Sequence, residues 1–394
     1  MDWITKAQNR KDTLISDRRW LHSHAEVGFD LKQTFPYVWN RLTEMGYEPK
    51  QVGKAGISAE LKGKADGKTL LLRADMDALP IQEESDVPFP CPNGAMHACG
   101  HDMHTAMLLG AAELLKDHGA LNGTVRFMFQ PAEEIFQGSA DMIENGILAD
   151  PRPDAAMMIH VTAAMPIPTG TVIVSAPGVS APAADYFTIK VMGKGCHGSA
   201  PQNGVDALTA AAHIVIALQE LHARELASTD EAVLTIGTCR AGSANNAIAD
   251  SAVLGGTIRT YDETTRSFLK QRLEEISRGI AGAFRASAEV TFGSGCPTLV
   301  NDKAFSEAVY ESVRTLLGDD RAISAAALGA GRGGGSEDFA YVSHEVPSVM
   351  LALAAGQPEK GYPYPQHHPK VKFDEDALPI GAAVFAQVAE QFLN

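Results

Sequence analysis

The sequence KTLLLRADMD, at residues 68–77, decides the fold class. A short apolar run bounded by turn-forming residues is typical of a strand that is buried in a parallel sheet. In open α/β sheets, functional sites gather beyond the carboxyl ends of the strands. Asp75 and Asp77 lie at that end, at alternate positions on one side of the strand, where either carboxylate can orient a metal-binding histidine. For Asp75, a simple strand-ending turn is an equally good interpretation.

Two further segments predict strands of the same sheet, TVRFMFQ at residues 124–130 and DAAMMIHV at residues 154–161. The first leads into the adjacent Glu133 and Glu134, and the second carries His160 near its end. Adjacent buried carboxylates are costly, but beside a dication one can bind the metal while the other acts as a base. The alternatives are a solvated acidic turn and a structural histidine.

The densest group of metal-binding residue types is HACGHDMH at residues 97–104, just before a predicted buried helix at 105–115. Cys99 and His101 are donors that suit a Zn-like ion, and Asp102 can orient a ligand. A polar helix cap with incidental histidines is the alternative, and we favour metal binding. Late in the chain, the sequence QHHP at residues 366–369 offers one more histidine ligand. Together these segments make a two-metal site plausible.

The bulk composition narrows the class of protein. A chain of 394 residues exceeds one typical core and predicts two domains. The net charge of -15 argues against nucleic acid or an anionic membrane as the main partner. We find no apolar leader and no apolar run long enough to span a bilayer. Five scattered cysteines do not resemble a disulfide framework, so we expect a reducing cytoplasm.

The middle of the chain changes character and predicts a separate domain. Its expected elements follow the order β-α-β-β-α-β, which is that of a ferredoxin-like split unit. The expected strands and helices cover residues 186–194, 205–226, 232–241, 252–260, 263–285 and 288–292. An exposed strand edge of this domain can pair with a second copy of the chain.

We therefore predict an α/β protein with two domains. Residues 1–180 and 295–394 form a discontinuous catalytic domain, with a mixed, largely parallel sheet flanked by helices. Residues 181–294 form an inserted ferredoxin-like α+β domain that serves as a lid or a dimerisation surface.

Three polar residues of the inserted domain are candidates for substrate contacts. His197, in the loop GCHGSAP at residues 195–201, can donate a hydrogen bond to a developing oxyanion. Arg259 can hold a carboxylate as a bidentate pair, and Asn246 lies near the predicted strands. Turn chemistry and strand-surface polarity explain all three equally well from spacing alone.

Taken together, the motifs resemble those of a known family, the dinuclear metal-dependent amidohydrolases. That family includes hippurate hydrolases, bacterial aminoacylases and plant auxin-conjugate hydrolases. The resemblance covers nearly the whole chain in order, through RADMDALP (73–80), HACGHD (97–102), QPAEE (130–134), HGSAP (197–201), SEDF (336–339) and the final His367-x-Pro369.

The resemblance implies two divalent metal ions per subunit, drawn from Zn, Mn, Co and Ni. It implies Glu133 as the general base and His197 as the lid histidine that meets the scissile carbonyl, in some relatives from the partner subunit. Asn246 and Arg259 match positions that bind a carboxylate. The implied metal ligands are Cys99, His101, Glu134, His160 and His367, and the last is chosen over His368 for its spacing to Pro369.

The expected reaction is hydrolysis of the amide bond of N-acyl or N-aroyl amino acids. A carboxypeptidase or dipeptidase with the same metal chemistry is the second interpretation. A metal- or amino-acid-binding protein is the third, disfavoured because a binding protein has no need of a base at Glu133. The expected partners are a small-molecule substrate and a second subunit in a homodimer, with a tetramer left open. The segment IFQ at residues 135–137 is bulkier than in many relatives and can reshape the acyl pocket.

Overall fold

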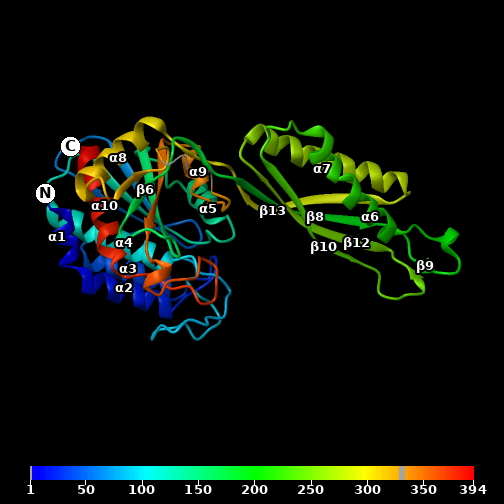
Figure 1. The fold of residues 1–394 in the computed structure, drawn as a ribbon, viewed down its shortest axis with the longest axis horizontal. Helices are drawn as coiled ribbons and strands as arrows, with labels where there is room; N and C mark the ends of the chain where they lie inside the picture. Colours follow the sequence, from blue (N-terminus) through cyan, green and yellow to red (C-terminus); the bar gives the residue numbers. More distant parts are fainter. Residues whose placement is uncertain (1, 328–332) are drawn as a thin grey trace. The chain divides into compact units, whose positions relative to one another are not determined.

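The computed structural model describes residues 2–327 and 333–394. The chain divides into two compact units, which are treated separately below (Figure 1). The first unit contains the residues up to Ser180, a segment from Val300 and the residues from Glu337 onward. The second is Ala181–Leu299 with a short stretch that ends at Ser336. The second unit extends past the predicted boundary at residue 294 because its last strand continues to Cys296, which pairs with Ala184.

The first unit is built on an eight-stranded mixed sheet. Its central strands run parallel, since β3 pairs in parallel with β4 and β5, and β5 pairs in parallel with β16. β3 is buried along its whole length, as its apolar run predicts. The strand order is β1 (Lys50–Val52), β2 (Gly56–Lys62), β4 (Thr124–Gln130), β3 (Thr69–Asp75), β5 (Ala155–Thr162), β16 (Ser348–Ala354), β6 (Val172–Val174) and β15 (Ala322–Ser324).

Helices flank this sheet and confirm the predicted α/β class. The buried helices α4 (His101–His118) and α10 (Ala377–Leu393) pack on each other and against β3. They are contacted by α1 (Trp3–Gln8), α2 (Lys11–Ser23), α3 (Thr34–Glu44) and α8 (Lys303–Leu317). The short helices α5 (Gly138–Glu144) and α9 (Ala340–Ser343) contact each other, β4 and β16. The pair β7 (Gly178–Ala181) and β14 (Leu299–Asn301) and the 3-10 helix Pro358–Lys360 complete the regular structure.

The second unit is a four-stranded antiparallel sheet with two helices. The strand order is β10 (Ala232–Ala241), β12 (Ser251–Thr260), β8 (Ala183–Met192) and β13 (Ser287–Cys296). Helices α6 (Ala207–Ala217) and α7 (Glu263–Ala283) pack on each other and on the sheet around an apolar core. A small pair, β9 (Cys196–His197) and β11 (Ala247–Ile248), lies apart from that sheet, and the 3-10 helix Pro201–Asn203 follows β9.

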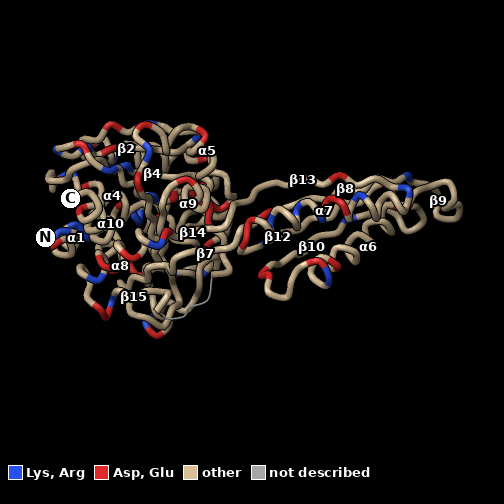
Figure 2. Tube along the Cα trace, turned by 90° about the horizontal axis from the view of Figure 1, so that it is seen from above, with Lys and Arg blue, Asp and Glu red and all other residues tan. Residues whose placement is uncertain are grey.

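Two predicted elements differ from the structure. The helix predicted at 205–226 begins at Ala207 as α6 and changes to a short π-helix at Leu221–Glu225, with Leu218 and Glu220 between them still in right-handed helical conformation. The helix predicted at 105–115 is longer in the structure, where α4 begins at His101 and ends at His118. None of the helices in the described ranges is long and apolar enough to cross a membrane. Acidic and basic residues are interspersed along both units (Figure 2).

One buried ion pair in the second unit allows a stability prediction. Asp185 is buried and accepts hydrogen bonds from Arg266 (2.6 and 2.9 Å) and Lys270 (2.9 Å). Burial favours the neutral acid, but these hydrogen bonds and charges hold the pKa of Asp185 below its ordinary value. We expect Asp185→Asn to lower the free energy of local unfolding by about 2–3 kcal/mol at pH 7.

The measurement is hydrogen exchange in peptides from β8 and α7. A depressed folded-state pKa stabilises the protein above the unfolded pKa of about 4, so the difference between variant and wild type shrinks as the pH falls below that value. Glu289→Gln, at an exposed position of β13, is the matched control and changes exchange little. Equal protection in the Asp185→Asn variant and the wild type contradicts the prediction.

Candidate functional site

The carboxyl ends of four parallel strands, β4, β3, β5 and β16, meet at one edge of the first unit's sheet. Helix α4 begins at the same edge. Gly100 precedes it with a φ of 93°, and a Cβ there would lie 2.4 Å from Val161 of β5. Glycine therefore permits both the left-handed turn and the close approach. This turn carries Cys99 and His101 to the strand ends.

Five side chains gather there with their metal-binding atoms close together. Cys99 Sγ lies 3.4 Å from His160 Nε2 and 3.3 Å from His367 Nε2. Glu134 Oε1 lies 3.6 Å from His367 Nε2 and 3.8 Å from His101 Nε2. Tetrahedral coordination with bonds of about 2.0–2.3 Å places ligand atoms about 3.3–3.8 Å apart. The observed separations fit that geometry.

Two further observations show that this cluster fits cations. Within the described part of the chain, the buried atoms His101 Nε2 and Glu134 Oε1 have no hydrogen-bond partner. Buried polar atoms without a partner are rare and call for a missing ligand, water or ion. Two of the possible donor groups share the thiol, Cys99 with His101 and His160, and Cys99 with Glu134 and His367.

The histidines of the cluster are oriented by backbone carbonyls. His101 Nδ1 lies 2.8 Å from the carbonyl oxygen of Asp77, and His160 Nδ1 lies 2.7 Å from that of Val161. A carbonyl only accepts, so Nδ1 carries a proton in each ring, and in the neutral ring that a metal requires the Nε2 lone pair faces the cluster. His367 is held by its backbone N–H, which donates to Ala98 at 2.9 Å.

The electrostatics of the cluster favour an added positive charge. Burial raises the pKa of the Cys99 thiol well above its usual value, and the Glu134 carboxylate adds to this shift. Burial also raises the pKa of Glu134 to about 7, although the charge of His101 opposes the increase. Burial lowers the pKa of His160. Burial acts in the same direction on His101, but the charge of Asp75 and the hydrogen bond to Asp77 raise the pKa of His101 well above its ordinary value. Metal binding needs the thiolate, the carboxylate and neutral imidazoles, so a cation displaces protons from Cys99, Glu134 and His101 and finds His160 already neutral.

Glu133 has a different environment from its neighbour. It is buried, and its backbone N–H donates to Asp77 Oδ1 at 2.9 Å, while that of Glu134 donates to Asp77 Oδ2 at 3.3 Å. Its own carboxylate lies 3.9 Å from His101 Nε2. Burial and the charges of Glu337 and Glu134 raise the pKa of Glu133 well above its ordinary value. This carboxyl group lies beside the cluster and favours holding a proton.

The two residues predicted to orient ligands behave differently in the structure. Asp77 supports His101 through its backbone carbonyl, and its carboxylate caps the turn that carries the two glutamates. The Asp102 carboxylate instead accepts from Arg18 Nε at 2.8 Å and lies 2.9 Å from His22 Nδ1. Asp102 thus fixes the start of α4 against α2.

Sequence reasoning missed a buried pair beneath the cluster. His104 Nδ1 lies 2.6 Å from Asp75 Oδ1, and His104 Nε2 accepts from the backbone N–H of Val161 at 2.8 Å. An Nε2 acceptor requires a neutral ring, and burial lowers the pKa of His104 to about 4. The available signal was the spacing of His101 and His104, which places both on one face of α4.

The three candidates of the second unit lie in two places. His197 lies on β9, and Asn246 directly precedes β11, which pairs with β9. The Gly198 N–H donates to the Asn246 carbonyl at 2.7 Å. Arg259, on β12, donates to Ser336 Oγ at 2.8 Å. His197 and Asn246 are exposed, and Arg259 is partly exposed.

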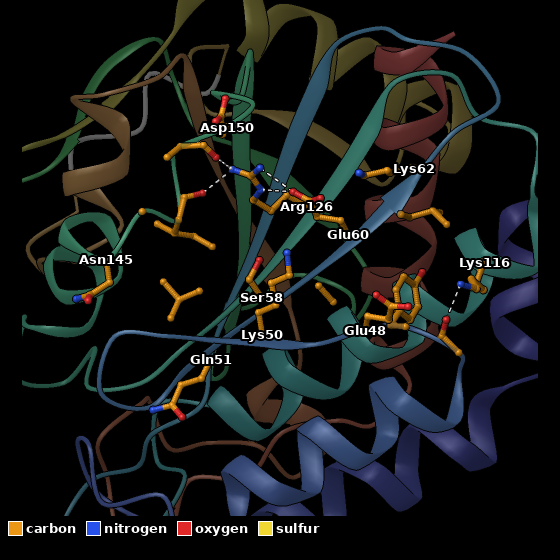
Figure 3. Close-up of a pocket in the computed structure, with 18 residues that line it drawn as sticks. Glu48, Lys50, Gln51, Ser58, Glu60, Lys62, Lys116, Arg126, Asn145 and Asp150 are labelled. Carbon is orange, nitrogen blue, oxygen red and sulfur yellow. Dashed lines mark hydrogen bonds and ion pairs between the residues drawn. The ribbon is translucent and has the colours of Figure 1, made fainter.

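A hollow of about 740 Å³ lies over β1, β2 and β4 (Figure 3). Arg126 in its wall donates to Glu60 at 2.7 and 2.9 Å and to the carbonyls of Ile147 and Ala149, each at 2.8 Å. The protein thus already satisfies this guanidinium. The hollow shares no residue with the donor cluster.

Comparison with known proteins gives a consistent match. The model of the family described as "Peptidase family M20/M25/M40" matches residues 71–391. The N-acetylcysteine deacetylase of Bacillus subtilis (strain 168) is 36% identical over 380 residues, covering 95% of this chain and 96% of that protein. The thermostable carboxypeptidase 2 of Saccharolobus solfataricus is 35% identical over 408 residues, covering 100% of both chains.

A solved structure agrees with these relatives. The structure of a dinuclear metal-binding peptidase of the M20 family from Bacillus subtilis superposes with a TM-score of 0.77 at 34% identity. The match covers 98% of this chain and 99% of that chain.

The site geometry predicts that the adjacent histidines 367 and 368 differ in metal binding. His368 stacks on Tyr364 at 4.3 Å and accepts from the Lys370 N–H, whereas His367 Nε2 faces Cys99. We expect His367→Ala to weaken binding of the added metal at least 100-fold, and His368→Ala to leave it within about threefold. Calorimetric titration of the chelator-treated protein with Zn²⁺ or Mn²⁺ measures both. Equal loss in the two variants contradicts this assignment.

Proposed function

The chain belongs to the peptidase family M20/M25/M40, and on that premise we propose that it hydrolyses the amide bond between an acyl group and an amino acid. Membership confirms the resemblance noted in the motifs and makes the chain a hydrolase of amide bonds. The observation that carries the finer proposal is one buried carboxyl group, Glu133, beside a thiol, carboxylate and imidazole cluster. Such an arrangement supplies both a metal centre and a separate base.

We propose that two divalent cations bind this cluster. Bound there, they would activate a water molecule and polarise the scissile carbonyl. Mixed sulfur, nitrogen and oxygen donors suit Zn²⁺, Mn²⁺, Co²⁺ and Ni²⁺. The residues proposed to hold them are Cys99, His101, Glu134, His160 and His367.

Glu133 supplies the proton transfers of the proposed reaction. Its carboxylate accepts a proton from the attacking water and then passes it to the leaving nitrogen. The group accepts a proton as a carboxylate and donates it as a carboxylic acid, so one residue serves both steps. The hydrogen bond from its backbone N–H to Asp77 fixes the carboxyl group in place.

We also propose that the second unit contributes to substrate binding and assembly. Ser199 N–H donates to His197 Nδ1 at 3.1 Å, so the proton of the neutral ring lies on Nε2, which is free to donate to an oxyanion. Asn246 and Arg259 are proposed to bind the substrate carboxylate. β10 is an edge strand, and exposed apolar side chains such as Leu208 and Ile216 on α6 favour a homodimer through this unit.

A carboxypeptidase is the second candidate, favoured by the 35% identity to the carboxypeptidase of Saccharolobus solfataricus. A substrate panel separates the two. We expect hydrolysis of hippurate or N-acetyl amino acids to exceed that of dipeptides and blocked peptides in kcat/KM, and a chelator to abolish it. Faster turnover of peptides by the untreated protein rejects the first proposal in favour of the second.

Glu133→Gln tests the proposed base. We expect kcat to fall 10²–10⁴-fold because the amide cannot accept the proton, while the metal content stays at the wild-type value. Glu134→Gln is the matched neighbour and should lose metal as well as activity. The readouts are steady-state kinetics and elemental analysis after dialysis. Wild-type kcat in Glu133→Gln removes this residue from the mechanism.

A further inference from the structure

A buried arginine lies beneath the strand ends and is not part of the reaction described above. Arg73, on β3, is fully buried. Its guanidinium donates to Gln130 Oε1 at 2.8 Å, Asp75 Oδ2 at 2.7 Å, Glu337 Oε1 at 2.9 Å and Asp338 Oδ1 at 3.0 Å. The guanidinium therefore links the ends of β3 and β4 to a segment more than 260 residues later.

Asp338 is the member of this network that reaches the turn carrying Glu133. Besides Arg73, it accepts from Gln130 Nε2 at 2.6 Å and from Ser139 N–H at 3.0 Å. Gln130 is the last residue of β4, and Ser139 lies in the first turn of α5. One buried carboxylate thus holds both ends of the connection that contains Glu133.

The connection itself is tight and needs such support. Ala132 and Phe136 have positive φ values of 55° and 53°, which non-glycine residues adopt rarely. A Cβ at Gly138 would lie 1.6 Å from the carbonyl oxygen of Pro131, so the chain closes on itself at this point. Strained backbone persists only where surrounding contacts hold it. Asp338 at the two ends and Asp77 at the centre provide these contacts.

We propose that Asp338 is a positioning residue for Glu133, with Arg73 as its anchor. The proposal rests on the proposed role of Glu133 as the base. Carboxylate oxygens of Glu133, Glu337 and Asp338 lie within 4.8 Å of one another, which resembles a third cation site. The Arg73 guanidinium already pairs with Glu337 and Asp338, so Asp338 holds the turn rather than an ion.

Asp338→Asn breaks the network with almost no change in shape. The carboxylate accepts from three N–H donors on two oxygens, whereas an amide turns one of those oxygens into an NH₂ group that faces a donor. We expect kcat to fall 10–100-fold, with KM and the metal content within about threefold of the wild type. Amides of residues 131–139 should exchange hydrogen at least tenfold faster, with β4 unchanged.

A double-mutant cycle distinguishes positioning from a general structural effect. If Asp338 acts through Glu133, adding Asp338→Asn to Glu133→Gln lowers the residual kcat by less than about threefold. Glu60→Gln is the matched control, because it breaks a partly buried ion pair between β2 and Arg126 of β4 (Figure 3) and should leave kcat unchanged. The assay uses whichever amide the wild-type protein hydrolyses best.

Three results would overturn the proposal. These are a loss of metal that matches the loss of activity, an unchanged exchange rate in residues 131–139, or the same fold-loss of kcat in both backgrounds. A wild-type protein that prefers peptides to acyl amino acids would instead reject the proposed substrate. The cycle would still be run on the peptide and would still decide the role of Asp338.

Discussion

The compensation of buried acids is the constraint on which this molecule depends. Parallel strands bring their carboxyl ends to one edge, and this chain places five acids there, of which all but Glu134 are buried: Asp75, Glu133, Glu134, Glu337 and Asp338. Isolated buried carboxylates cost several kcal/mol each unless an opposite charge or hydrogen-bond donors surround them. The Arg73 guanidinium pairs with Asp75, Glu337 and Asp338, and the cations proposed above would compensate the remaining carboxylates. Of the two adjacent glutamates, Glu133 lies near Glu337 and Asp338, which pair with Arg73, and Glu134 lies with Cys99 and His367.

This division explains why the edge contains two kinds of histidine. His101 and His160 donate through Nδ1 to carbonyls and turn Nε2 toward the donor cluster, as metal ligands require. His104 uses both nitrogens inside the protein, between Asp75 and the Val161 N–H. Its ring therefore fixes the end of β5 relative to β3. All three rings lie close together, and their hydrogen-bond partners distinguish the potential metal ligands, His101 and His160, from the structural residue His104.

Sequence patterns predicted the sheet well because its strands are short apolar runs between turns. Residues 124–130 and 232–241 are strands with the predicted bounds. Patterns also selected five residues whose side chains gather in the structure: Cys99, His101, Glu134, His160 and His367. Their roles as metal ligands stay predictions. Patterns did not find the role of Arg73, because an arginine inside an apolar run gives no sign of its partners. Three of these partners, Gln130, Glu337 and Asp338, are 57 to 265 positions away.

The different environments of Glu133 and Glu134 follow from backbone geometry rather than from their chemistry. The backbone N–H groups of Glu133 and Glu134 both donate to the Asp77 carboxylate, which fixes the backbone of both residues. The side chains then diverge. Glu134 lies with Cys99 and His367, where cations would hold it ionised, while Glu133 lies near Glu337 and Asp338, whose charges favour its protonated form. A turn held at its centre by Asp77 and at its ends by Asp338 thus directs two identical side chains to different neighbours, which is the separation that the proposed metal ligand and the proposed base require.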